Sequence, residues 1–110
     1  MVNVTFEQKG NKLILQLKGH AGYAEIGKDI VCASCSILAY TVAQFVNESD
    51  RTGFLKSPPV IKLESGDTVI SCEPVDELLI DIQNMYFFAE KGYSLLAQNY
   101  PQYVVLKQFN

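Results

Sequence analysis

The stretch from Ile30 to Val46 constrains the fold more than any other feature, because none of its 17 residues carries a charge. Such a run must be buried, either in a bilayer or against other apolar surface. A bilayer requires roughly 20 apolar residues, so the run is short for a membrane span. It also contains four polar side chains, which are Ser34, Ser36, Thr41 and Gln44. We therefore predict a buried helix of a folded domain.

Asp29 stands directly before this run, in the position that a helix N-cap residue occupies. A carboxylate there accepts hydrogen bonds from the free amides of the first helical turn. The helix is predicted to continue to Asn47 or Ser49. Because it is apolar nearly all round, we expect it to lie in the centre of the fold, against a sheet.

Alternating apolar residues predict strands on both sides of this helix. The predicted strands cover residues 2–6, 13–17, 60–63, 68–72 and 103–106. Lys9-Gly10-Asn11 lies between the first two strands and Ser65-Gly66-Asp67 between the next two. Short turns of this composition are typical of β-hairpins. The sequence therefore predicts two hairpins and one further strand.

A second helix is predicted to begin at Pro74 or Asp76 and to end before Pro101, because apolar residues recur at helical spacing between them. Gly92 weakens this helix without ending it. The element order is then ββαββαβ, which predicts an α+β fold: a small, mostly antiparallel or mixed sheet with two helices packed on it. The length of 110 residues suits a single domain over residues 1–110.

Composition excludes several classes of protein. Hydrophobic residues make up 48% of the chain and charged residues 19%, which is typical of a packed domain and not of a disordered one. A net charge of −3 without a basic stripe argues against a dedicated nucleic-acid binder. Three cysteines, an odd number, favour a reducing compartment over a disulfide scaffold. The N-terminus has no signal-peptide pattern, so we expect a cytoplasmic protein.

The chemistry centres on His20 and Cys32, which flank a glycine-rich segment, residues 21–28, that is predicted to be a loop. Cys32 would be the third residue of the helix, where the macrodipole and unpaired amides favour a thiolate. A strand end and a helix start joined by such a loop can come together, so His20 can take the proton of the thiol. The same helical amides are candidate donors to an oxyanion on an attacked carbonyl.

Other interpretations use the same residues. A lone histidine at a strand end is commonly a surface residue, and cysteines such as Cys35 and Cys72 are common in cores. Residues 32–35 also form a C-x-x-C, which at a helix start is typical of thiol–disulfide exchange. His20 and the three cysteines could together hold zinc, although their spacing matches no standard zinc module.

A longer pattern extends over this region. Gly19-His20-Ala21 is followed by Gly27-Lys28-Asp29-Ile30-Val31-Cys32-Ala33 and then by Ser36. This resembles the signature of the Prp family, the ribosomal-processing cysteine proteases, which reads G-H-A, a short variable stretch, then G-x-D-x-V-C-A-x-x-S. The resemblance covers residues 19–36, and the element order over the rest of the chain agrees with that family.

The resemblance implies a cysteine endopeptidase that removes the N-terminal extension of a large-subunit ribosomal protein, number twenty-seven of that subunit, near paired phenylalanines. It implies His20 as general base and Cys32 as nucleophile, with Asp29 and Ser36 supporting the site. The loop expected to bind substrate comprises Ala21, Gly22, Tyr23, Ile26 and Gly27. Family members are homodimers, and no cofactor, metal, nucleic acid or membrane partner is expected.

Some alternatives stay open at this point. Asp29 either caps the helix or also orients His20, and Ser36, one turn beyond Cys32, either hydrogen-bonds in the site or supports the helix. A non-enzymatic ribosome-assembly module would use the same loop to bind its partner and would not need Cys32. A thiol–disulfide redox protein would need Cys35, whereas a protease would not.

Overall fold

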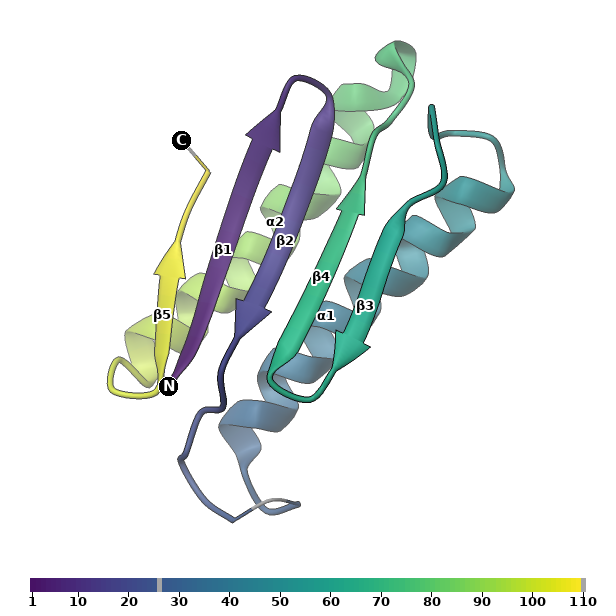
Figure 1. Ribbon diagram of the computed structural model, residues 1–110. Coiled ribbons are helices and arrows are strands. Elements are labelled where there is room, and N and C mark those ends of the chain that lie inside the picture. Colours follow the sequence, from purple (N-terminus) through teal and green to yellow (C-terminus); the bar gives the residue numbers. More distant parts are fainter. Residues whose placement is uncertain (26, 110) are drawn as a thin grey trace.

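The computed structural model describes residues 1–25 and 27–109, which form two layers (Figure 1). A five-stranded sheet makes one layer, and two long helices on the same face of the sheet make the other. The strands are β1 (Val2–Lys9), β2 (Lys12–Lys18), β3 (Val60–Glu64), β4 (Asp67–Cys72) and β5 (Val104–Lys107), and the helices are α1 (Ile30–Arg51), the short 3-10 helix η1 (Asp76–Leu78) and α2 (Leu79–Asn99). The predicted α+β fold and its element order are confirmed.

The sheet is mixed, with strand order β3-β4-β2-β1-β5. β5 runs parallel to β1, and the other neighbouring strands are antiparallel. Both predicted hairpins form, with turns after Lys9 and after Glu64. The pairing of β2 with β4 joins segments on either side of α1 in the sequence, and its last partners are Lys18 and Asp67. The end of β2 therefore lies beside the β3–β4 turn.

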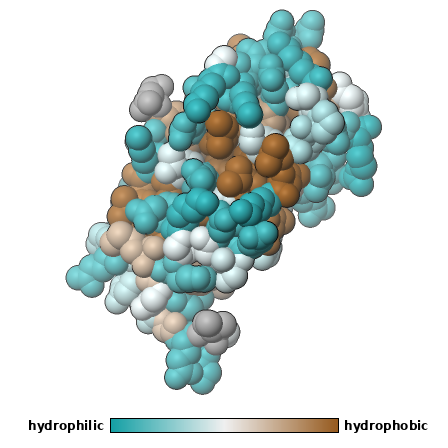
Figure 2. All heavy atoms as spheres, viewed as in Figure 1, coloured by the Kyte–Doolittle hydropathy of each residue, from teal (hydrophilic) through white to brown (hydrophobic). Residues whose placement is uncertain are grey.

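The period-two alternation of the strands separates the two faces of the sheet. On the face toward the helices the largest side chains are fully buried. They include Val4, Phe6, Leu13, Leu15 and Ile70. The opposite face is open to solvent, and Figure 2 shows an apolar area at its centre with hydrophilic side chains around it. Ile14, Val60 and Val69 occupy outward positions there.

α1 begins at Ile30 after the predicted cap and ends at Arg51, slightly beyond the predicted end. α1 packs on the sheet as expected, but it does not lie in the centre, because no third layer among the described residues covers its outer face. Ile37 and Tyr40 on that face are 62% and 52% exposed. By length and composition alone α1 could also cross a membrane, a test that core helices of soluble proteins pass as well. Its buried side chains include Val31, Cys35, Ala39, Val42, Ala43 and Val46.

α2 begins at Leu79, later than predicted, because the 3-10 turn η1 precedes it. It ends at Asn99, before Pro101, and continues through Gly92 as predicted. Gly92 lies where α2 meets α1, since a Cβ atom there would be 2.9 Å from both terminal methyl carbons of Leu38. The glycine therefore permits the close approach of the two helices.

Candidate active site

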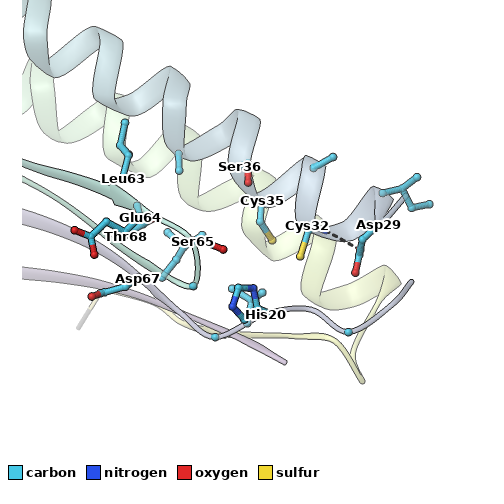
Figure 3. Close-up of a pocket in the computed structure, with 18 of the residues that line it drawn as sticks. His20, Asp29, Cys32, Cys35, Ser36, Leu63, Glu64, Ser65, Asp67 and Thr68 are labelled. Carbon is cyan, nitrogen blue, oxygen red and sulfur yellow. Dashed lines mark hydrogen bonds between the residues drawn. The ribbon is translucent and has the colours of Figure 1, made fainter. Parts of the chain in front are cut away.

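The two predicted reactive side chains reach the same end of the molecule from different elements. β2 ends at Lys18 and His20 follows it, while α1 carries Cys32 in its first turn. Both residues line a cleft of about 710 Å³, in which the imidazole and the thiol come from opposite walls (Figure 3). The structure thus brings the predicted pair together in one cleft.

The sulfur of Cys32 is half-buried and faces the backbone of the loop. The N–H of Ala21 donates to Sγ at a distance of 3.4 Å. The positive end of the α1 macrodipole lies in the same turn. Both features stabilise negative charge that develops on the sulfur, as a nucleophilic cysteine requires.

Asp29 is buried and its carboxylate ties the loop to the helix. Oδ1 accepts from the N–H groups of Val31 at 3.0 Å and Cys32 at 2.9 Å, and Oδ2 accepts from those of Tyr23 at 2.9 Å and Ala24 at 3.2 Å. Burial acts to raise the pKa of Asp29, but the four hydrogen bonds outweigh it and hold the pKa below the ordinary value of 3.8. The predicted helix cap is confirmed.

These hydrogen bonds change the interpretation of the helix amides. Two of the first-turn amides that were candidate donors to an oxyanion, those of Val31 and Cys32, are already bound to Asp29. A helix cap and an oxyanion hole use the same donors, so one excludes the other here. Within the described residues Asp29 makes no hydrogen bond to His20, and an orienting role is not supported. The donor placed at the nucleophile is the amide of Ala21.

Ser36 lies one turn after Cys32 and lines the cleft (Figure 3). Other hydroxyls of α1 bond to the carbonyl one turn earlier, as Ser34 does to Ile30 at 2.7 Å and Thr41 does to Ile37 at 2.7 Å. No such bond is found for Ser36 in the part of the chain that the structure describes. Its hydroxyl is therefore available to a molecule in the cleft.

Comparison with known protein families gives one match over most of the chain. The sequence profile of the family described as cysteine protease Prp matches residues 1–105. The chain belongs to the Prp family. It is a cysteine protease, and the resemblance seen over residues 19–36 extends over nearly the whole chain. No curated protein matches the chain at a significant level.

Several solved structures share this fold, and two of them are of a Prp protease. The essential ribosomal processing protease Prp from S. aureus with a covalently linked product peptide is 20% identical, with a TM-score of 0.72 over 98% of this chain and 99% of that one. The same protease with a substrate peptide is 19% identical, with a TM-score of 0.67 over 98% and 99%. SMU.848 from Streptococcus mutans is 26% identical, with a TM-score of 0.66 over 99% and 94%. The two-layer architecture is thus that of the Prp fold.

The predicted substrate-binding loop of this Prp protein lies only partly at the cleft. Gly22 and Gly27 line it, whereas Ala21 is buried behind the sulfur of Cys32. Ile26 lies outside the described residues.

Tyr23 turns away from the cleft. Its ring packs edge-on against Tyr100 and Tyr103, with ring centroids 5.6 Å and 5.1 Å apart. These partners lie in the connection between α2 and β5, which no local sequence pattern relates to the loop. A role for Tyr23 in substrate binding stays a prediction that this placement does not support.

The other two cysteines are buried, with 3% exposure at Cys35 and 2% at Cys72. Burial, with the nearby Cys32 and Asp29, raises the pKa of the Cys35 thiol to about 11, so Cys35 is protonated at neutral pH. Within residues 1–25 and 27–109 no three metal-ligating side chains gather at one place. The candidate zinc ligands are therefore not brought together.

The β3–β4 turn forms one wall of the cleft, and its place there was not predicted from the sequence. Ser65, Gly66 and Asp67 line the cleft together with the Prp signature residues (Figure 3). The turn itself was predictable from its composition, but its place beside His20 depends on the long-range pairing of β2 with β4. No signal in the local sequence shows that pairing.

Proposed function

We propose that this Prp protein is an endopeptidase in which Cys32 is the nucleophile and His20 the general base. The observation that supports the proposal is the presence of both side chains on opposite walls of one cleft, with an amide directed at the sulfur. Cys35 and Cys72 are buried, and Cys35 is protonated at neutral pH, so Cys32 is the cysteine suited to attack. The chain offers a single histidine to act as its base.

The reaction follows from these positions. His20 takes the proton of Cys32, and the sulfur attacks the scissile carbonyl carbon to form a C–S bond. The amide of Ala21 donates to the sulfur and stabilises its negative charge before the attack. As the C–N bond breaks, the imidazolium protonates the leaving amine. His20 then removes a proton from water, which hydrolyses the thioester and frees the sulfur.

We propose as substrate the N-terminal extension of a large-subunit ribosomal protein, number twenty-seven of that subunit, cut near paired phenylalanines. The related S. aureus protein is a ribosomal processing protease that binds a substrate peptide. Both α1 and the sheet contribute apolar residues to the lining of the cleft, which suits apolar side chains of a substrate; they are Leu17, Ala39, Tyr40 and Leu63. A basic ribosomal protein would also be attracted to a chain of net charge −3.

We also propose a cytoplasmic homodimer. The outer face of the helical layer exposes large apolar side chains, among them Ile37 at 62%, Phe88 at 72% and Leu95 at 59%. Exposed apolar side chains grouped on one face are typical of association surfaces. Light scattering on the purified protein should give twice the chain mass, and Phe88→Glu should reduce it to the mass of one chain.

The decisive experiment incubates the protein with a peptide that carries the paired-phenylalanine extension and identifies products by mass spectrometry. We expect one cut by the wild-type protein and none by Cys32→Ala or His20→Ala. Loss of either member of a shared catalytic unit costs on the order of ~4 kcal/mol of transition-state stabilisation or more. Cys35→Ser is the matched control, a nearby cysteine whose loss should leave the cut in place.

The same variants separate the alternatives. A binding module would show no cut by folded, reduced wild-type protein, and Cys32→Ala would bind the peptide as tightly as wild type. A redox protein would lose its function in Cys35→Ser and keep it in His20→Ala. Either pattern would overturn the assignment of the Cys32–His20 pair.

A further inference from the structure

The imidazole of His20 lies directly against the β3–β4 turn. A Cβ atom at Gly66 would be 2.7 Å from Nε2 of His20, 3.0 Å from Cε1 and 3.3 Å from Cδ2. Real Cβ atoms do not approach other heavy atoms as closely as the first of these distances. The ring therefore occupies the space that any side chain at Gly66 would need.

Several bonds hold this turn against the end of β2. The N–H of Gly19, the residue before His20, donates to the carbonyl of Gly66 at 3.0 Å. The carboxylate of Asp67 binds Nζ of Lys18, and its other oxygen accepts from Nζ of Lys62 at 2.5 Å. A backbone bond thus joins Gly19 to Gly66, and a side-chain contact joins Lys18 to Asp67.

The main chain of His20 accepts a hydrogen bond from the N-terminal ammonium of Met1, but its ring has no such partner among the described residues. His20 is exposed to solvent, and its ring makes no hydrogen bond to any residue that the structure describes. A ring of this kind is free to change rotamer on the nanosecond timescale unless something beside it restricts the motion. The contact with Gly66 restricts this motion on one side of the ring.

We propose that Gly66 is a positioning residue for the His20 base. Because glycine has no side chain, the imidazole can pack directly against the main chain of the turn. The proposal depends on the proposed function, because it explains how the base is kept on the wall of the cleft opposite Cys32. Gly66 also lines the cleft, but this role does not require contact with the substrate. It acts through the ring of His20 alone.

The test compares two glycine substitutions. Gly66 has a φ of +71°, so Gly66→Ala introduces both left-handed backbone strain and a clash with the ring. Gly10, in the β1–β2 turn, has a φ of +60° and open space where its Cβ would lie. Gly10→Ala therefore introduces the same kind of strain without touching His20, and it is the matched control.

We expect Gly66→Ala to lower kcat/KM for the peptide by about 10²-fold, which is the usual effect of misplacing a catalytic group by about 1 Å. The loss should be in kcat, with KM little changed, because the change displaces the base and leaves the apolar lining of the cleft in place. Gly10→Ala should retain kcat within about twofold, since surface changes remote from a site are usually near neutral. A rise in KM alone, or equal losses in both variants, would overturn the positioning role.

A second measurement does not depend on activity. His20 is the only histidine, so its ring protons give unambiguous NMR signals. We expect a nuclear Overhauser effect between these protons and the Hα protons of Gly66 in the wild-type protein, and its loss in Gly66→Ala. Absence of the effect in wild type would refute the contact without any variant.

The two measurements also separate this proposal from the proposed function. If wild-type protein shows the NMR contact but does not cleave the peptide, the protease assignment fails while the contact between Gly66 and His20 stands. If the protein cleaves the peptide and Gly66→Ala cleaves it equally well, the positioning role fails and the catalytic pair stands.

Discussion

Asp29 accepts a hydrogen bond from the backbone amide of Cys32 at 2.9 Å. The carboxylate that caps α1 therefore also fixes the main chain of the proposed nucleophile. Its second oxygen binds the amide of Tyr23 at 2.9 Å, so the same side chain holds the loop that leads to His20. Helix capping and loop positioning are combined in one buried carboxylate.

Removal of this carboxylate should lower the stability of the protein. We expect Asp29→Ala to reduce the free energy of unfolding by about 1–2 kcal/mol, because four backbone amides lose their acceptor and helix caps contribute about this much. Asp29→Asn, which keeps one acceptor oxygen, should lose less. Urea denaturation of the three proteins measures both differences, and equal stability of wild type and Asp29→Ala would contradict the account.

The contribution of Asp29 to stability should depend on pH. Its folded pKa lies below the ordinary 3.8, so the stabilisation by its charge is fully present above that value and is lost as the pH falls through the folded pKa. Asn does not titrate. The difference in unfolding free energy between wild type and Asp29→Asn should therefore be constant above pH 3.8 and shrink in more acidic buffer. A difference that stays constant down to acid pH would contradict the depressed pKa.

Alkylation should distinguish the three cysteines. Cys32 is half-buried, whereas Cys35 and Cys72 are buried and burial raises the pKa of both thiols. Iodoacetamide at neutral pH should therefore modify Cys32 alone, and peptide mapping by mass spectrometry identifies the site. Cys32→Ser should take up no label while folded and should be labelled at both remaining cysteines once unfolded. Rapid labelling of Cys35 in the folded protein would contradict its placement.

The contact between the helices should be sensitive to side-chain size. Gly92→Val should reduce the free energy of unfolding by about 1–3 kcal/mol, because its side chain enters space that Leu38 occupies. Leu38→Ala should recover part of this loss in the double variant. A double-mutant cycle measures the coupling, and strictly additive effects would show that the two residues do not share this space.

Much of the fold follows from local sequence. The alternation in 2–6 and 13–17 places Val4, Phe6 and Leu15 on the buried face, and Asp29 marks the start of α1 to the residue. Long-range partners were not predictable in the same way. β5 pairs in parallel with β1, and the ring of Tyr23 packs on that of Tyr103, so both contacts join segments far apart in the chain. Neither the spacing of apolar residues nor a turn residue indicates which distant segments meet.

In the site, too, local features were predictable from the sequence and long-range contacts were not. The position of Cys32 in a first helical turn, with His20 after a strand, was predictable because both belong to one continuous stretch of chain. The helical amides were expected both to bind the Asp29 cap and to be available to an oxyanion, and the carboxylate uses two of them, those of Val31 and Cys32. Gly66 was missed as part of the site because its proximity to His20 depends on the sheet.

The antiparallel pairing of β2 with β4 has a consequence for the newly made chain. Synthesis proceeds from the N-terminus, so His20 and Cys32 leave the ribosome well before β4, which completes the wall opposite Cys32. Contacts between distant segments also form late, since loop closure must precede them. A nascent chain therefore carries the base and the nucleophile before it has a complete cleft. Peptidase activity should appear only once β4 has paired with β2.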